Sequence, residues 1–225
     1  LFPYSAPWWL PGGHAQTLSA ALAVPRPRVA YRRERWDTPD GDFIDLDWTV
    51  KPSAVSCQLS AGTSDVPLVV LFHGLEGSSR SHYALAMTAA VRDAGWRGAV
   101  VHFRGCSGEP NRLPRAYHSG DAREIDWIMR RLRAQHAHGP LFAVGVSLGG
   151  NALLKWLGES GEAAARIVDA AVAISVPLDL MVTGNALGQG FNLVYTRNFL
   201  ATLRAMSLAK LERFPGLYDA HAVRA

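Results

Sequence analysis

One serine stands in a setting that could make it a nucleophile. Ser147 lies in the pentapeptide GVSLG (145–149), after the apolar run 141–144 and before a segment rich in alanine and leucine. A sharp turn from a strand into a helix exposes a serine hydroxyl, and the flanking glycines let neighbouring backbone approach without a Cβ clash. The N–H of Leu148, at the start of that helix, would face an oxyanion formed beside the serine. The pattern favours nucleophilic chemistry at a carbonyl over its alternative, a buried serine in a glycine-rich turn.

A backbone amide is the second group that fits this chemistry. The apolar run 68–72 predicts a buried strand, and it leads into the glycine-punctuated loop HGLEG at 73–77. A helix ended by Gly95 is expected next, with helical spacing of Tyr83, Met87, Ala90 and Val91. A loop at the carboxyl end of a strand can present an N–H to an oxyanion, and Leu75 N–H is the candidate donor. The alternative is a plain tight turn at the end of a strand.

The remaining strands follow from turn signals and apolar runs. Residues 31–50 predict a β-hairpin, because Pro-Asp-Gly at 39–41 supplies the turn and the second half alternates as Ile44, Asp45, Leu46, Asp47 and Trp48. The runs 99–103 and 170–176 predict two further strands, and the polar residues 51–66 predict a surface loop.

Two helices are predicted to flank the nucleophile strand. Asp121 and Glu124 have the spacing of a capping box at the start of the first helix. Its expected buried face consists of Ile125, Ile128, Met129 and Leu132. The second helix follows the serine, and its expected face consists of Ala152, Leu153, Trp156 and Leu157.

Other residues with reactive side chains are interpreted as structural. Cys106, in the loop RGCSG at 104–108, has no cationic or helix-terminal setting of the kind that stabilises a thiolate, so this loop is assigned to scaffolding. His136 and His138 are expected to interact favourably with the helix dipole at a C-terminus rather than to bind a metal. His14 has no partner within reach by sequence and is expected to be structural. No metal or cofactor is expected.

Composition limits the class of protein. The 225 residues, 48% of them hydrophobic, are sufficient for one domain with a sizeable core. The net charge of +4 is a mild excess spread over scattered arginines, so a nucleic-acid partner is not expected. Cys57 and Cys106 form no disulfide framework, which favours a reduced, cytoplasmic compartment. No apolar run is long enough for stable membrane insertion, and the oligomeric state stays open.

Both ends of the sequence differ in character from its centre. Residues 1–29 contain five prolines around Trp8 and Trp9, so an irregular arm is expected that buries its tryptophans against the domain. Residues 177–218 are broken by glycine and asparagine and then predict a long helix. Its wide apolar face, with Phe191 at its start, predicts a helical lid, and an ordinary packing helix is the alternative.

Five motifs together resemble one known family. They are PWWLPGGHAQT, DGDFIDLDW, HGLEGSS, HFRGCSGEPNRLPRAYHSGD and GVSLGGNALLKWLGE. They are similar to the YheT-type hydrolases, a group within the α/β-hydrolase superfamily that includes bacterial esterases. Animal lipases are similar to this group. The resemblance covers nearly all of the chain. It implies one α/β-hydrolase domain over 1–225 with a mostly parallel sheet, helices on both faces, a lid and the strand order 1-2-4-3-5-6-7-8.

The resemblance also implies a reaction. Ser147 would be the nucleophile of a serine hydrolase that cleaves carboxylic esters of small or lipid-like molecules through an acyl-enzyme, with Leu75 and Leu148 N–H forming the oxyanion hole. An acyltransferase, a thioesterase and a non-catalytic binding module remain alternatives. The acid and histidine of the triad follow later strands in this fold, so we expect both to lie outside this chain, with the C-terminal part of the fold absent. Asp179 and His221 are considered for these roles and not favoured.

Overall fold

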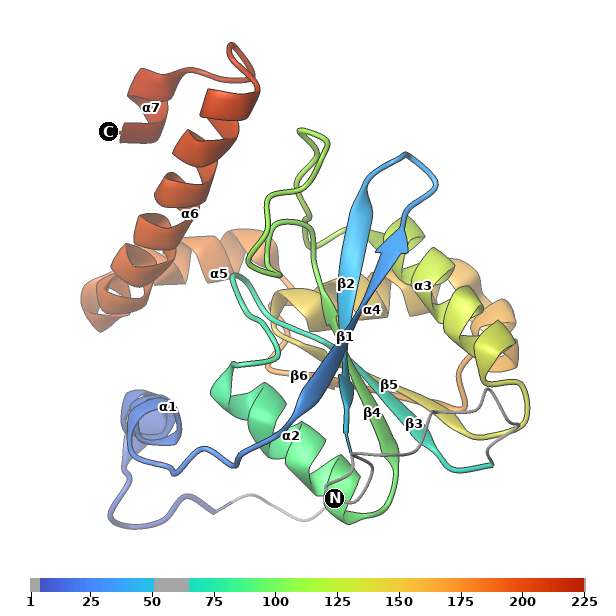
Figure 1. The fold of residues 1–225 in the computed structure, drawn as a ribbon. Coiled ribbons are helices and arrows are strands. Elements are labelled where there is room, and N and C mark those ends of the chain that lie inside the picture. Colours follow the sequence, from blue (N-terminus) through green and yellow to red (C-terminus); the bar gives the residue numbers. More distant parts are fainter. Residues whose placement is uncertain (1–4, 51–64, 225) are drawn as a thin grey trace.

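The computed structural model describes residues 5–50 and 65–224. Within these ranges the chain forms a six-stranded sheet with the order β1-β2-β4-β3-β5-β6 (Figure 1). Four strands run parallel, namely β3 (Leu68–Phe72), β4 (Arg97–His102), β5 (Leu141–Val146) and β6 (Ala170–Ile174). The hairpin strands β1 (Tyr31–Asp37) and β2 (Phe43–Thr49) are antiparallel, and β2 joins β4. The predicted mostly parallel sheet and the order of its first six strands are confirmed.

Helices cover both faces of this sheet (Figure 1). Helix α2 (His82–Asp93) packs on one face, where Ala84 and Leu71 belong to one buried cluster. Helices α3 (Ala122–Gln135) and α4 (Leu148–Ser160) pack on the other face and contribute to the larger core. The apolar runs of the parallel strands therefore meet side chains on both sides, as strands buried on two faces require.

The predicted helix faces agree with the structure except in α2. In α3 the four expected positions are fully buried, and in α4 only Leu157 keeps partial exposure. In α2 Ala90 is exposed, whereas Ala84 and Thr88 are buried. Alanine is small enough to occupy either face, so its position in the sequence is a weak guide to burial. Gly95 ends α2 with a φ of 78°, as expected.

The predicted hairpin is present, and its strand β2 is buried along both faces. Asp45 and Asp47 are as buried as the apolar residues between them. Arg35 and Arg33 on β1 form paired hydrogen bonds with these two carboxylates. Burial of a carboxylate is tolerated when such partners replace water. The aspartates of β2 therefore do not indicate a solvent-exposed face of the strand.

The expectation for residues 1–29 is wrong in two respects. Residues Gly12–Leu22 form helix α1, because the prolines lie outside this stretch and Pro11 occupies the N-cap position, where a missing N–H costs nothing. Trp8 is 92% exposed and Trp9 is 61% exposed, so neither tryptophan is buried against the described domain. The expected surface loop at 51–66 lies almost wholly outside the described residues.

The segment predicted as a lid is helical. It comprises α5 (Leu180–Leu187), a 3-10 turn (Gly190–Asn192), α6 (Leu193–Arg213) and, after a turn, α7 (Ala220–Arg224). Helices α5 to α7 lie together on one side of the molecule (Figure 1). No residue of α5 or α6 is buried, so these helices do not join the core of the domain. A 3-10 helix at Gly161–Arg166 follows α4 and leads into β6, whose Val172 and Ile174 are exposed.

Candidate active site at the Ser147 turn

Ser147 joins β5 to α4 in a backbone conformation that residues with a Cβ rarely adopt. Its φ is 52° and its ψ is −118°, a conformation that costs about 1–3 kcal/mol. Two hydrogen bonds hold it, since its N–H donates to Ile174 O at 2.9 Å and its carbonyl accepts from Asn151 N–H at 3.0 Å. Among the described residues its hydroxyl has no hydrogen-bond partner. The serine is therefore presented by a strained turn and left unbonded.

The two glycines around Ser147 are sterically required. A Cβ on Gly149 would lie 2.4 Å from the carbonyl oxygens of both Phe72 and His73. A Cβ on Gly145 would lie 2.5 Å from the Cα of Gly150. Only glycine permits these approaches, which bring the start of α4 against the end of β3.

The HGLEG loop at the end of β3 leaves a single amide unoccupied at its centre. Among residues 74–77 three N–H groups are engaged, with Gly74 donating to Tyr83 OH, Glu76 to Tyr117 OH and Gly77 to Gly74 O. The N–H of Leu75 has no acceptor among the described residues. Buried or half-buried backbone amides are normally paired, so this free donor is a feature that requires an explanation.

The structure brings the three predicted site residues to one edge of the sheet. Strands β3 and β5 are neighbours, and Leu75 and Ser147 follow their carboxyl ends. A Cβ on Gly74 would lie 3.2 Å from the Cβ of Ser147, so the loop and the turn are in contact. Leu148 is the first residue of α4, and its N–H also has no acceptor in the described part of the chain.

His73 lies beside this site but cannot serve as its base. The imidazole is fully buried, and its Nε2 accepts Phe103 N–H at 3.1 Å while its Nδ1 lies 2.7 Å from Gly74 O. Because Nε2 is an acceptor, Nδ1 carries the proton and donates to that carbonyl. Burial lowers the pKa of His73 to about 4, so the ring is neutral and both of its nitrogens are committed to holding the loop.

Neither Asp179 nor His221, the two candidates considered for the triad, forms a hydrogen bond with Ser147 in the described part of the chain. Asp179 is the N-cap of α5, where its carboxylate accepts Val182 N–H at 2.9 Å. His221 is exposed on α7. No described histidine or carboxylate is hydrogen-bonded to the hydroxyl of Ser147.

A buried cluster around Asp47 was missed by the sequence reasoning. Its carboxylate accepts from His102 Nε2 at 2.9 Å, from Ser79 Oγ at 2.6 Å and from Arg33. Burial alone would raise the pKa of Asp47, but the bonds from Arg33, His102 and Ser79 outweigh it and hold the pKa below its usual range. The cluster joins β2, β4 and the segment before α2, so it braces the strands behind the HGLEG loop.

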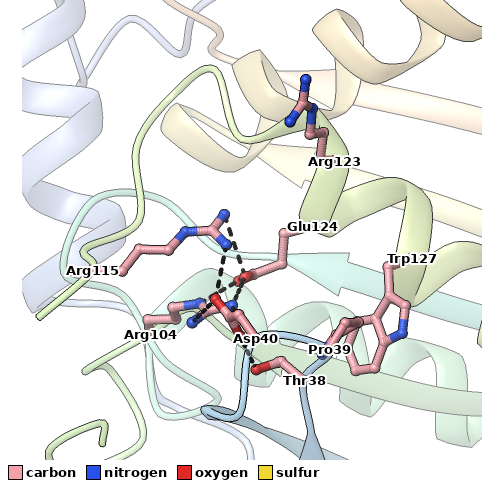
Figure 2. A pocket seen from close by; sticks show the side chains of 8 residues that line it. All are labelled: Thr38, Pro39, Asp40, Arg104, Arg115, Arg123, Glu124 and Trp127. Atoms are coloured by element: carbon pink, nitrogen blue, oxygen red, sulfur yellow. Dashed lines mark hydrogen bonds and ion pairs between the residues drawn. The ribbon is translucent and has the colours of Figure 1, made fainter. Parts of the chain in front are cut away.

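A second ionic cluster surrounds Arg104 (Figure 2). Its guanidinium contacts Glu124 at 2.7 Å and Asp42 and Asp40 at 3.1 Å. Glu124 belongs to α3 and the two aspartates to the β1–β2 turn, so Arg104 fastens the hairpin to the helix. The predicted capping box is therefore wrong. Asp121 makes no side-chain cap bond, because it accepts from Arg115 at 2.6 Å instead.

A cavity of about 160 Å³ opens beside this ionic cluster. Figure 2 shows Trp127 and Pro39 flanking it, with the side chain of Arg123 pointing away from the other charges. None of the three predicted site residues lines it. Its charged groups mostly satisfy one another, so we interpret it as a crevice over a structural ion-pair network.

Cys106 does not have the environment of a reactive thiol. Burial raises the pKa of Cys106 to about 12, far above the range in which a thiolate forms at neutral pH. The backbone N–H of Cys106 donates to Phe103 O at 2.9 Å, which closes the turn after β4. Gly105 in the same loop lies under Met206 of α6, since a Cβ added to it would lie 3.0 Å from the terminal methyl group of that methionine.

The helix α6 is attached near both ends by a few polar contacts. Tyr195 bonds to His14 on α1 at 3.1 Å, and the two rings stack at 5.7 Å. Near the other end Lys210 donates to the carbonyls of Pro114 and Arg115, and Arg213 donates to that of Asn111. His14 therefore connects α1 to the segment predicted as a lid.

The described residues form neither a metal site nor a membrane-spanning helix. No group of three or more His, Cys, Asp or Glu side chains in this part of the chain could hold a metal ion. No described helix is both long and apolar enough to cross a bilayer.

The fold and the serine turn define the class of protein. A model of the α/β-hydrolase fold matches residues 67–219, and the chain belongs to this family. The chain is similar to YheT of Escherichia coli (strain K12), which is named as an esterase, with 41% identity over 90% of this chain and 57% of the relative. The predicted resemblance to the YheT-type hydrolases is confirmed.

A more distant sequence relative and a solved structure of the same fold also match the chain. Human phospholipase ABHD3 is 30% identical over 90% of this chain and 48% of its own length. The crystal structure of an α/β serine hydrolase without lid from Xanthomonas campestris has a TM-score of 0.50 at 18% identity and covers 70% of this chain and 66% of that one. The chain thus spans about half the length of the curated relatives that it matches.

Proposed function

We propose that this chain carries the nucleophile and the oxyanion hole of a serine hydrolase that cleaves carboxylic esters. One observation carries the proposal: the strained Ser147, with an unbonded hydroxyl, lies beside the two amides of Leu75 and Leu148, which have no acceptor in the described chain. An oxyanion would supply the acceptor that both amides lack. The names of the esterase and phospholipase relatives support the same chemistry.

The proposed reaction proceeds through an acyl-enzyme. Ser147 Oγ attacks the ester carbonyl, and the resulting oxyanion accepts hydrogen bonds from Leu75 and Leu148 N–H. Collapse of this intermediate releases the alcohol, and attack by water then releases the carboxylic acid and restores the serine. The serine proton needs a base. We propose that the triad histidine and acid lie outside residues 1–225, a proposal supported by the unbonded hydroxyl of Ser147.

A fluorophosphonate probe tests the nucleophile. The full-length protein should be labelled, and labelling should disappear in Ser147→Ala. A full-length protein that stays unlabelled, or that is labelled equally after the substitution, would support a non-catalytic binding module instead.

We propose small esters with short or medium acyl chains as substrates. The exposed apolar side chains of α5 and α6 fit an acyl group, and the phospholipase name of the human relative favours a lipid-like molecule. A panel of p-nitrophenyl esters of rising chain length, with an acyl thioester beside it, tests this choice in the full-length protein. Highest activity on the longest chains would contradict it, and preference for the thioester would favour a thioesterase.

The position of the triad partners has its own test. Residues 1–225 alone should show little turnover, because a serine without its base retains only about 10³–10⁴-fold catalysis over water. We also expect poor solubility from the exposed apolar side chains of β6. A monodisperse and active fragment would mean that the base and acid lie within it, and Asp179 and His221 would be the first residues to substitute.

A further inference from the structure

Two tyrosine hydroxyls hold the backbone on either side of Leu75. Tyr83 OH accepts Gly74 N–H at 2.9 Å, and Tyr117 OH accepts Glu76 N–H at 2.8 Å. Tyr83 comes from the first turn of α2, and Tyr117 comes from the loop before α3. The amides immediately before and after Leu75 are therefore occupied by side chains from two separate elements.

The peptide group that contains Leu75 N–H is held through its carbonyl. This oxygen belongs to Gly74 and accepts from His73 Nδ1 at 2.7 Å and from Gly77 N–H at 3.0 Å. The peptide is trans, so the N–H of Leu75 points opposite to that carbonyl. Since the peptide planes before and after it are fixed by Tyr83 and Tyr117, the direction of the free N–H is determined.

Glu76 shows how Tyr117 acts on this loop. Its φ is 55°, a left-handed conformation that is unfavourable for a residue with a long side chain. Tyr117 OH both accepts Glu76 N–H and donates to Glu76 Oε1 at 2.8 Å, which stabilises this conformation. The ring of Tyr117 stacks on Phe103 with centroids 5.2 Å apart and planes 2° from parallel, so the hydroxyl is itself held in place.

We infer that Tyr83 and Tyr117 are positioning residues of the oxyanion hole, which act by aligning Leu75 N–H toward the oxyanion on Ser147. The inference rests on the proposed function. Neither hydroxyl touches the reacting atoms, and each bonds an amide next to the donor. An oxyanion donor stabilises the transition state more than the bound substrate, so loss of alignment should lower kcat more than it changes KM.

Tyr117→Phe and Tyr83→Phe in the full-length protein test the inference. Each substitution keeps the ring and removes the hydroxyl. We expect kcat for ester hydrolysis to fall by about tenfold or more in each variant, with KM changed by less than about twofold. The affinity for a trifluoromethyl ketone, which forms a tetrahedral adduct with the serine, should fall by the same factor as kcat/KM.

Tyr31→Phe is the matched control. Tyr31 OH bonds to Thr88 Oγ1 at 2.6 Å and donates to Ser79 O at 3.2 Å, and its ring packs against the same small cluster as Tyr83. It bonds to no amide of the HGLEG loop, so its removal should cost comparable stability and leave kcat unchanged. Melting temperatures of all three variants show whether each is folded at the assay temperature. If either Tyr83→Phe or Tyr117→Phe is unfolded, the kinetics of the other variant test the inference.

The outcomes separate the inference from the function on which it rests. An active wild type, an inactive Ser147→Ala and a selective loss of kcat in the two tyrosine variants would support both. Unchanged kcat in Tyr117→Phe and Tyr83→Phe beside an active wild type, or an equal loss in Tyr31→Phe, would overturn the inference alone. A wild type without serine-dependent turnover would overturn the proposed function and the inference together.

Discussion

Substitution of Gly149 by alanine probes the contact between the nucleophile turn and the oxyanion loop. The new Cβ would lie 2.4 Å from the carbonyl oxygens of Phe72 and His73, which are backbone atoms and cannot rotate away. The start of α4 and the end of β3 must separate by about 1.0 Å to restore ordinary contact. We expect a loss of about 1–3 kcal/mol in the free energy of unfolding. The same shift moves Ser147 away from Leu75 and should lower kcat by about 100-fold.

Gly158 in the same helix provides the control. A Cβ at this position meets nothing within 4 Å. Gly158→Ala should therefore raise the free energy of unfolding by about 0.5–1 kcal/mol, because alanine is the better helix former, and should leave kcat unchanged. Urea unfolding and ester hydrolysis at saturating substrate, both on the full-length protein, measure the two quantities. Wild-type stability and activity in Gly149→Ala would refute the steric argument.

Three further predictions concern buried groups. Asp47→Asn should cost about 1.5–3 kcal/mol by weakening the hydrogen bonds that Arg33, Ser79 and His102 make to a buried carboxylate. Asp37→Asn breaks only an exposed ion pair and should cost less than about 1 kcal/mol. Since the pKa of Asp47 is lowered in the folded protein, its contribution to the free energy of unfolding is present above about pH 4 and is lost as the pH falls. The free energy of unfolding should therefore decrease less steeply with falling pH in Asp47→Asn. An unchanged pH profile would contradict the stabilising role of the Asp47 cluster. The pKa of His73 is lowered to about 4 in the folded protein, so as the pH falls the unfolded chain takes up this proton first. The free energy of unfolding should therefore fall by up to about 3 kcal/mol between about pH 6.5 and pH 4. Urea unfolding across this range should show a weaker pH dependence of this free energy in His73→Gln. Cys106 should resist iodoacetamide at pH 8 in the folded protein, as measured by peptide mapping, and Cys106→Ser should retain turnover. Rapid labelling, or loss of turnover at an unchanged melting temperature, would refute the structural role of Cys106.

Local patterns in the sequence were sufficient to predict the strands, the hairpin and the serine turn. Each of these depends on neighbouring residues, such as the glycines that flank Ser147 or the apolar run of β3. The sheet order, in contrast, came from the resemblance, because strand neighbours are set by contacts between distant segments.

Long-range partners explain what the sequence did not predict. Asp47 is buried because His102 lies 55 positions away in the chain and bonds to it. Tyr117 holds Glu76 from 41 positions away, so nothing in the HGLEG motif itself identifies the tyrosine. The prediction that Trp8 and Trp9 are buried was wrong for a different reason. Apolar residues are buried on average, but an individual apolar side chain can stay exposed.

The left-handed backbone of Ser147 sets thermal stability against reactivity at one position. Glycine adopts a φ near 50° without the steric penalty of a Cβ, which is about 1–2 kcal/mol in the left-handed region. Ser147→Gly is therefore a substitution that should strengthen the fold while it removes the nucleophile. A screen of variants for heat resistance alone would enrich this change, so heat resistance has to be selected together with turnover if the serine is to survive.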